Sequence, residues 1–447
     1  MKTKIIYIIA LGFLLSSTFL EYSQANSSEN PTLFLTLLKE ERYEEAYKME
    51  DQKMQELLPQ HTLQKMWENM KKNLGKLMSF ETRATTTKDG YLVANILCRF
   101  EKMTLLAQVA IDSEGKVASL YFLPYTEHQY TLPPYVDQDR FSEREITFGV
   151  PEWELPGTLT IPREKGPFPA VVLVHGSGPN DRDETVMGNK PFRDIAWGLA
   201  TQGVATLRYD KRTYVYGMKI SSSPEISRFT VEEEVITDTL QALQFLSRQP
   251  EIDPEKVFLF GHSLGGYLAP EIAFRDGKLK GIILCAAPAR PLHQLIPEQM
   301  EYVFSLDGVL ASDETQQLKA IQKAVEGINQ RIFAPEEIVT ELGGHAIYFY
   351  SLMDINPLKS AQKILVPILI IQGGRDYQVT EKDWNLWKET LVSKLAVSFQ
   401  CYPSLNHLLC PGKGTPSPQE YETPNHVDGN LVQDIAEWIK KRAYSKE

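Results

Sequence analysis

Residues 257–269 constrain this chain more than any other stretch, because they join a strand pattern to a helix pattern through a turn built around one serine. Apolar residues at 257–260 precede Gly-His-Ser-Leu-Gly, and apolar residues then recur at helical spacing. A turn this tight needs residues without side chains on both sides of the serine, and Gly261 and Gly265 meet that need. The pattern predicts a strand, a sharp turn that exposes Ser263, and a helix.

A functional serine requires partners, because its hydroxyl is a weak nucleophile. Acyl chemistry at Ser263 needs a base, a carboxylate that orients the base, and amide donors for developing negative charge. The helix after the turn presents its first free N–H groups there, beginning with that of Leu264. Short Gly-x-Ser-x-Gly matches also arise by chance, so the flanking strand and helix are what favour a functional serine.

Asp376 is the predicted orienting carboxylate. It follows the apolar strand pattern at 367–372 and stands on a glycine-rich turn, so we expect it at the carboxyl end of a strand, facing the crevice. A turn aspartate that bonds its own backbone is the structural alternative. Asp354 and Asp383 are weaker candidates for the same role.

His407 is the predicted base, because it follows the last strand pattern, in a loop from which a side chain can reach back over the sheet. His426, in a polar and proline-rich segment, is the alternative base. His262 adjoins the serine, but we expect it to point away from it and to pack in the interior.

The second oxyanion donor is expected in the loop after the strand pattern at 170–174. This loop contains His-Gly-Ser-Gly-Pro over 175–179, and its glycines let the backbone approach a ligand oxygen. A main-chain N–H of Ser177 or Gly178 is therefore the predicted donor. We expect His175 to brace the loop rather than to react.

Residues 26–124 form the first predicted domain. Helical spacing of apolar residues extends over 33–49 and again from Pro59 to Gly75. Strand patterns separated by turns follow at 91–100, 104–111 and 117–123. These patterns predict a small α+β domain without a cluster of catalytic residue types. A structural role is favoured over substrate or wall binding and over dimerisation.

The segment 125–141, which contains two adjacent prolines and lacks apolar periodicity, is predicted to be a linker. Over 142–447 strands alternate with helices, which predicts an α/β domain with a mostly parallel sheet and helices on both faces. A helical insertion is expected at about 291–360, with Ser312 as the N-cap of one helix. Its aromatic residues 348–350 could line an acyl pocket, although core packing is the favoured interpretation.

The first 25 residues are typical of a signal peptide. Lys2 and Lys4 precede an apolar run over 5–15, and small residues at Ser23 and Ala25 suit cleavage after Ala25. The run is short for a membrane span, although an uncleaved anchor is the alternative. The expected protein is exported, either periplasmic or secreted, with no integral membrane span after cleavage.

Charge and cysteine content limit the class of partner. The net charge is −11, and removal of residues 1–25, which hold two lysines and one glutamate, would make it about −12. This negative net charge argues against nucleic acid and anionic membranes as partners. The cysteine spacings match no zinc pattern, and neither a metal nor a cofactor is expected. Cys401 and Cys410 bracket a loop that a disulfide could close.

With these residues the chain resembles bacterial α/β-hydrolases of the carboxylesterase kind, in particular those with a small α+β domain of unknown function ahead of the hydrolase. The resemblance rests on His-Gly-Ser-Gly-Pro at 175–179, Arg-Tyr-Asp-Lys-Arg at 208–212, Gly-His-Ser-Leu-Gly-Gly at 261–266 and Gly-Gly-Arg-Asp at 373–376. Relatives usually continue Asp-Lys-Arg with Gly-x-Gly, whereas this chain has Thr-Tyr-Val-Tyr-Gly at 213–217. That departure affects the rim of the pocket and not the catalytic residues. The resemblance also implies a cap over the site at the insertion.

The predicted activity is hydrolysis of small carboxylic esters, with short to medium acyl chains, through an acyl-enzyme on Ser263, with His407 as base and Asp376 as its orienting acid. An acyltransferase or a peptidase on the same residues is an alternative, because the pattern leaves the acceptor open. A cell-envelope binding protein with a vestigial site is the alternative from another class. The oligomeric state does not follow from the sequence.

Overall fold

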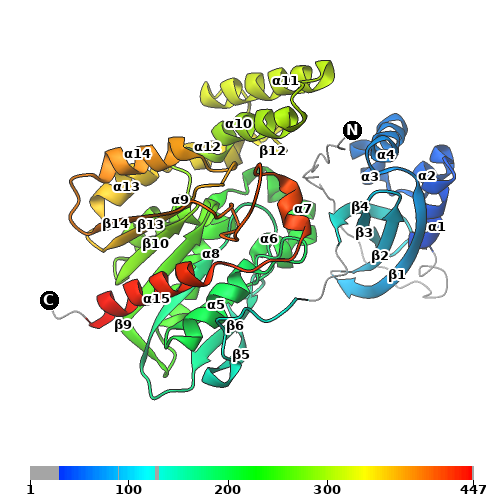
Figure 1. Ribbon diagram of the computed structural model, residues 1–447. Coiled ribbons are helices and arrows are strands. Elements are labelled where there is room, and N and C mark those ends of the chain that lie inside the picture. Colours follow the sequence, from blue (N-terminus) through cyan, green and yellow to red (C-terminus); the bar gives the residue numbers. More distant parts are fainter. Residues whose placement is uncertain (1–29, 89, 126–129, 445–447) are drawn as a thin grey trace. The chain divides into compact units, whose positions relative to one another are not determined.

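The computed structural model describes residues 30–88, 90–125 and 130–444 (Figure 1). The predicted signal peptide, residues 1–25, lies outside the described residues, so its cleavage and the export of the protein stay predictions. The chain divides into two compact units. One runs to Glu127 and includes Met218–Ile226, and the other comprises His128–Gly217 and Ser227–Glu447.

The first unit packs helices against one face of an antiparallel sheet in the order β1-β2-β3-β4. Trp67 lies at the centre of this core, with its ring centroid 6.0 Å from that of Phe100 and 6.1 Å from that of Phe122. The helices and strands are α1 (Asn30–Lys39), α2 (Tyr43–Met49), α3 (Gln52–Leu57), α4 (Gln60–Leu74), β1 (Leu77–Lys88), β2 (Tyr91–Phe100), β3 (Thr104–Ile111) and β4 (Val117–Pro124). The helix α7 (Gly217–Ser222) falls largely in the added segment of this unit.

The second unit is an α/β domain whose sheet has the order β14-β13-β10-β9-β7-β8-β6-β5. The strands from β14 to β8 are parallel, whereas β6 and β5 are antiparallel to their neighbours. The sheet strands are β5 (Phe141–Phe148), β6 (Leu155–Pro162), β7 (Phe168–Val174), β8 (Ala205–Tyr209), β9 (Ile252–His262), β10 (Gly281–Cys285), β13 (Ile368–Gly373) and β14 (Val397–Tyr402).

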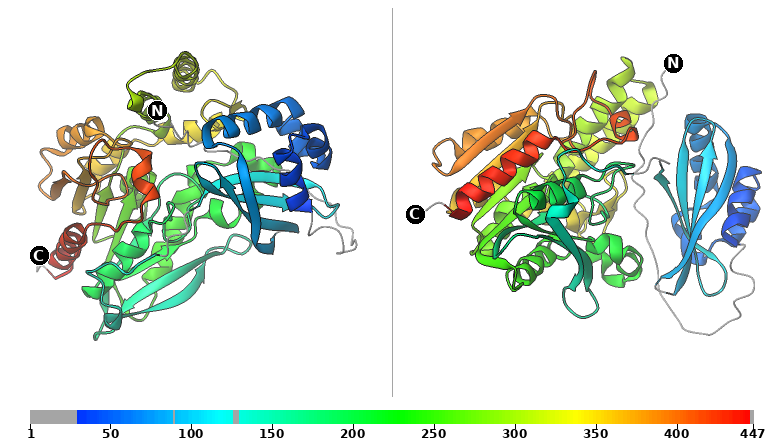
Figure 2. Two further views of the ribbon diagram at one scale, coloured as in Figure 1. Left: turned by 45° about the vertical axis from the view of Figure 1, so that its right-hand side comes forward. Right: turned by 60° about the horizontal axis from the view of Figure 1, so that its bottom comes forward.

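Helices cover both faces of this sheet, as the strand–helix alternation predicts (Figure 1 and Figure 2). One face packs against α5 (Pro191–Thr201) and α15 (Gly429–Tyr444). The other packs against α8 (Thr237–Leu246), α9 (Leu264–Asp276), α13 (Pro357–Lys363) and α14 (Glu381–Leu391). The short helix α6 (Arg212–Val215) follows β8. The central strands are buried on both faces, which explains their continuous apolar sequences.

The helical insertion lies between β10 and β13. It consists of α10 (Leu292–Phe304), α11 (Ser312–Asn329), the paired short strands β11 (Ile338–Val339) and β12 (Gly344–His345), and α12 (Ala346–Asp354). The predicted N-cap was wrong by one residue, because α11 begins at Ser312 and its N-cap is Ala311. The carboxylate of Glu314 accepts from the N–H of Ala311 at 2.9 Å, which satisfies this helix start without a capping hydroxyl.

The possible disulfide between Cys401 and Cys410 is not formed, and both residues are free thiols. Cys401 is exposed on the edge strand β14, whereas Cys410 is buried, and burial raises the pKa of its thiol well above the ordinary value. The two side chains therefore face different surroundings.

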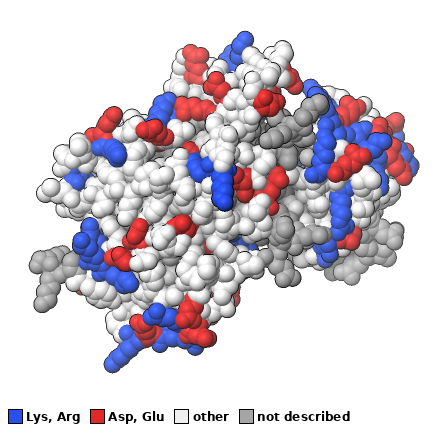
Figure 3. All heavy atoms as spheres, viewed as in Figure 1, with Lys and Arg blue, Asp and Glu red and all other residues white. Residues whose placement is uncertain are grey.

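Among the described residues, no helix combines the length and the apolar character that crossing a membrane requires. On the face of the molecule in Figure 3, basic side chains lie next to acidic ones at several places.

Candidate active site

Ser263 occupies the sharp turn that the sequence predicts, between the end of β9 and the start of α9. Its φ of 50° and ψ of −114° are unusual for a residue with a side chain and cost about 1–3 kcal/mol. A Cβ added at Gly261 would lie 2.3 Å from the carbonyl oxygen of Gly265, and one added at Gly265 would lie 2.2 Å from that of Val174. The glycines are therefore required by close backbone approach, and Ser263 stays only half-buried.

His407 and Asp376 are in direct contact. His407 Nδ1 lies 2.8 Å from Asp376 Oδ2, and both residues are buried. Asp376 follows the carboxyl end of β13, and its Oδ1 accepts from the N–H groups of Gln378 and Val379 at 2.8 and 3.0 Å. These two bonds fix the carboxylate, so its second oxygen faces the imidazole.

The loop after β14 holds His407 through its neighbour Asn406. The side-chain oxygen of Asn406 accepts from the N–H groups of Leu408 and Cys410 at 3.0 and 3.2 Å. This local bonding shapes the loop around His407. The ring of His407 lies beside the serine turn, because its centroid is 4.8 Å from that of His262.

The alternative base and acids have other partners. His426 lies with its Nδ1 3.2 Å from Asp194 Oδ2 and its Nε2 3.0 Å from Thr131 Oγ1. Asp383 is paired with Arg290 at 2.7 Å. Asp354 is exposed and pairs with Arg331. The structure thus brings Asp376, and none of these carboxylates, to His407.

The predicted oxyanion loop lies against the serine, since a Cβ added at Gly176 would be 3.2 Å from the Cβ of Ser263. The N–H of Gly176 donates to Glu184 Oε1 at 2.6 Å and is therefore occupied. The side-chain amide of Asn180 donates to the carbonyl oxygens of Gly176 and Ser177, both at 3.1 Å. In a trans peptide the N–H points opposite to the C=O, so these bonds turn the N–H groups of Ser177 and Gly178 away from Asn180.

His175 is buried below this loop, with ring centroids of Phe192 and Tyr209 at 5.0 and 5.3 Å. Burial lowers its pKa to about 4, so the ring stays neutral at physiological pH. This packing agrees with the bracing role expected for His175.

A second buried pair, Glu184 and His262, connects the oxyanion loop to the base. Glu184 Oε2 lies 2.9 Å from His262 Nδ1, and His262 Nε2 lies 2.8 Å from the carbonyl oxygen of His407. Burial alone would lower the pKa of His262, but the Glu184 carboxylate and the His407 carbonyl raise it above its ordinary value. The same ion pair holds the pKa of Glu184 below its ordinary value despite burial.

The stabilisation from this pair is expected to depend on pH. Because the pKa of His262 is raised in the folded state, the contribution is complete below about pH 6.5 and is lost as pH rises through the folded pKa. The difference in unfolding free energy between the wild type and His262→Gln, measured by urea unfolding, should therefore be larger at about pH 6 than at about pH 9. An equal difference at both values would show that the imidazole does not ionise in this range.

Sequence reasoning assigned no role to Glu184, Asn180, Lys211 or Glu234. Lys211 lies in the motif Arg-Tyr-Asp-Lys-Arg at 208–212, shortly after the end of β8, and this position was the available signal in the sequence. Glu184 lies in a polar loop without a distinguishing pattern, and its φ of 51° is visible only in the structure.

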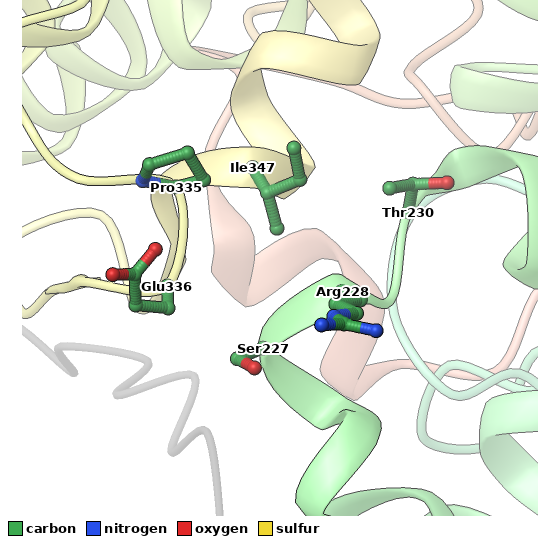
Figure 4. Close-up of a pocket in the computed structure, with 6 residues that line it drawn as sticks. All are labelled: Ser227, Arg228, Thr230, Pro335, Glu336 and Ile347. Atoms are coloured by element: carbon green, nitrogen blue, oxygen red, sulfur yellow. The ribbon is translucent and has the colours of Figure 1, made fainter.

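A cavity of about 530 Å³ lies between the segment before α8 and the insertion. Figure 4 shows its lining, which is Ser227, Arg228, Thr230, Pro335, Glu336 and Ile347. Its lining is mixed in polarity and includes none of Ser263, Asp376 and His407. It therefore does not define an acyl site by itself.

Two of the aromatic residues 348–350 of α12 pack in the core, in agreement with the interpretation favoured from the sequence, and Tyr348 is half-buried. Phe349 and Tyr350 are buried, and the hydroxyl of Tyr350 donates to the carbonyl of Phe333 at 2.9 Å. The hydroxyl of Tyr348 donates to Glu234 Oε2 at 2.6 Å.

Comparison with known proteins assigns a protein family to each of two parts of the chain. Residues 167–411 match the family described as serine aminopeptidase, S33, and residues 32–120 match a protein family of unknown function (DUF3887). The chain is 39% identical over 409 residues to Esterase EstD of Thermotoga maritima, and the alignment covers 92% of this chain and 94% of that protein.

Two solved structures are also similar. Est1E from Butyrivibrio proteoclasticus has a TM-score of 0.44 and 16% identity over 67% of this chain and 99% of its own. The acylaminoacyl peptidase of Pyrococcus horikoshii has a TM-score of 0.46 and 15% identity over 83% of this chain and 57% of its own. By its sequence match, its sheet and its serine turn, the chain belongs to the α/β-hydrolase family of the S33 serine aminopeptidases, with a DUF3887 domain ahead of the hydrolase domain.

Proposed function

We propose that this protein is a serine esterase that cleaves carboxylic esters of short to medium acyl chains through an acyl-enzyme on Ser263. The observation that carries the proposal is the contact of 2.8 Å between His407 Nδ1 and Asp376 Oδ2 beside the serine turn. The relative that is 39% identical over most of the chain is named an esterase, which supports the same activity.

The proposed mechanism uses main-chain and side-chain groups of the chain itself. Asp376 accepts a hydrogen bond from the Nδ1–H of His407, which keeps the proton on Nδ1 and leaves Nε2 free to take the hydroxyl proton of Ser263. The serine oxygen attacks the ester carbonyl carbon, and the N–H groups of Leu264 and of Ser177 or Gly178 stabilise the oxyanion. The imidazolium then protonates the leaving alcohol. Water attacks the acyl-enzyme with His407 as base, and the acid is released.

The limit on acyl length is proposed from the insertion. It begins soon after β10, whose last residue Cys285 accepts from the N–H of Ser263 at 3.0 Å, and ends ahead of β13, which leads to Asp376. A helical cap at this position would restrict the space for a long acyl chain.

A peptidase is the second candidate, because the matching family is described as serine aminopeptidase. An aminopeptidase needs a free carboxylate for the α-ammonium group of its substrate. Of the buried glutamates near the oxyanion loop, Glu184 lies 2.9 Å from His262 Nδ1 and Glu234 lies 2.7 Å from Lys211 Nζ, so both carboxylates already have a counter-charge. This occupation favours the esterase.

The proposal is tested with the purified protein on p-nitrophenyl esters from acetyl to palmitoyl, beside alanine and leucine p-nitroanilides. We expect ester turnover that falls steeply towards the long acyl chains, and labelling by a fluorophosphonate on the peptide that contains Ser263. Faster cleavage of the anilides would favour the peptidase. If the protein turns over none of these substrates and Ser263 is not labelled, the result would contradict a serine hydrolase.

A further inference from the structure

The ammonium group of Lys211 is buried directly behind the predicted oxyanion loop. Lys211 is 2% exposed. Its Nζ donates to the carbonyl oxygens of Gly176 at 2.9 Å and Gly178 at 3.0 Å, and it lies 2.7 Å from Glu234 Oε1. An ammonium has three N–H donors, so each donor has an acceptor. Two of these acceptors belong to the loop that lies against Ser263.

One of these contacts, together with the bond that Asn180 Nδ2 donates to the same carbonyl oxygen of Gly176 at 3.1 Å, sets the direction of a predicted oxyanion donor. The carbonyl of Gly176 and the N–H of Ser177 belong to the same peptide unit, and in a trans peptide they point in opposite directions. A cation that holds the Gly176 oxygen therefore aims the Ser177 N–H away from Lys211. The bond also polarises the peptide unit, which makes that N–H a stronger donor.

The same peptide segment is held from its other side. The N–H of Gly176 donates to Glu184 Oε1 at 2.6 Å. Lys211 itself is held by Glu234, whose second oxygen accepts from the hydroxyl of Tyr348 on α12 at 2.6 Å. Two buried charged residues, Lys211 and Glu184, thus hold the oxyanion loop by hydrogen bonds. Lys211 is linked to the insertion through Glu234 and Tyr348.

We propose that Lys211 is a positioning residue of the oxyanion hole, which orients and polarises the Ser177 N–H through the carbonyl of Gly176. This inference rests on the proposed esterase function. Lys211 does not touch the substrate, and its effect is exerted on the transition state through the peptide unit that it holds. Glu234 neutralises the ammonium and keeps it in place.

The test is the double variant Lys211→Met with Glu234→Gln, which removes both charges and so leaves no buried charge without its counter-charge. The substrates are p-nitrophenyl acetate and its thiono analogue, in which sulfur replaces the carbonyl oxygen. Sulfur accepts hydrogen bonds poorly, so the thiono ester gains little from a well-aimed N–H. We expect kcat/KM for the oxygen ester to fall about 10- to 100-fold, and the oxygen-to-sulfur ratio of kcat/KM to fall by a similar factor.

This ratio separates positioning from a structural role. A variant that only folds less completely has fewer active molecules, so both substrates slow equally and the ratio stays that of the wild type. The matched control is Arg212→Met with Asp238→Asn. This neighbouring pair is also buried, with Arg212 Nε 2.9 Å from Asp238 Oδ2, and Asp238 lies on α8. We expect the control to lose stability but to keep the wild-type ratio.

The outcomes distinguish the inference from the function on which it rests. If the wild type hydrolyses the ester but the Lys211 variant keeps the wild-type oxygen-to-sulfur ratio of kcat/KM, the positioning role is overturned and the esterase proposal stays intact. A fall in the ratio in the Arg212 control as large as in the Lys211 variant would also overturn it. If the wild type shows neither turnover nor fluorophosphonate labelling, the esterase proposal fails, and the inference fails with it.

Discussion

Replacing Ser263 by alanine is expected to lower kcat for nitrophenyl ester hydrolysis by about 10⁶-fold, to the level that binding and oxyanion donors alone supply. The reason is that Ser263 Oγ would be the atom that forms the acyl-enzyme, and no neighbouring group on the turn can replace it. Steady-state kinetics on the purified variant measure the effect, with the fluorophosphonate as an independent probe of the nucleophile.

The fold of this variant should be retained. Alanine keeps the Cβ and the N–H that donates to Cys285 at 3.0 Å, so the turn loses no backbone contact. The free energy of unfolding should therefore stay within about 1 kcal/mol of the wild type. Ser312→Ala, at the exposed start of α11, is the control for the exchange of a serine, and it should change kcat less than twofold or so. Residual activity of Ser263→Ala above about 1% of the wild type would place the nucleophile elsewhere.

The sheet and its helices were predictable from the sequence because their signals are local. The strands β2, β10 and β14 coincide with apolar runs of the sequence at 91–100, 281–285 and 397–402. Each is an apolar run, continuous or alternating, bounded by turn residues. The α/β class then follows from the alternation of such strands with helices, and the sheet order confirms it.

Two features of the first unit were not predicted correctly, because the sequence carries no local signal for either. The strand β1 was missed because its sequence is polar and mostly exposed, and it exists through pairing with β2. The helix predicted over 33–49 is broken between α1 and α2. Glu41 has a φ of 61°, and the N–H of Arg42 donates to the carbonyl of Leu37 at 2.9 Å, which is a helix-ending motif that usually contains glycine. No glycine marks this break in the sequence.

The candidate site likewise contains residues that a local sequence pattern predicts and residues that no local pattern predicts. Ser263, Asp376 and His407 each follow a strand at its carboxyl end, so strand patterns alone indicated that they would meet. The groups that support them do not follow such a rule. Lys211 contacts the carbonyl of Gly176 across 35 positions of sequence, and Glu184 reaches His262 from a polar loop. Such contacts depend on how distant loops pack, which no single pattern encodes.

Replacing Asp376 by asparagine should lower kcat by about 10⁴-fold while preserving the fold. The asparagine oxygen can still accept from the N–H groups of Gln378 and Val379, which hold the turn. Its amide, however, donates a hydrogen bond where the carboxylate accepts one. His407 would then carry its proton on Nε2, the atom that must take the proton of Ser263, and would no longer act as base.

The control for this variant is Asp354→Asn, which changes an exposed carboxylate that pairs with Arg331 and was a weaker candidate for the same role. Its kcat should stay within about twofold of the wild type, as for other exposed substitutions. If kcat of Asp376→Asn fell less than about tenfold, the carboxylate would not fix which ring nitrogen of His407 carries the proton. Equal losses of kcat in both variants would point to a general effect of charge, because of these two carboxylates it is Asp376 that contacts the imidazole of His407, whereas Asp354 pairs with Arg331.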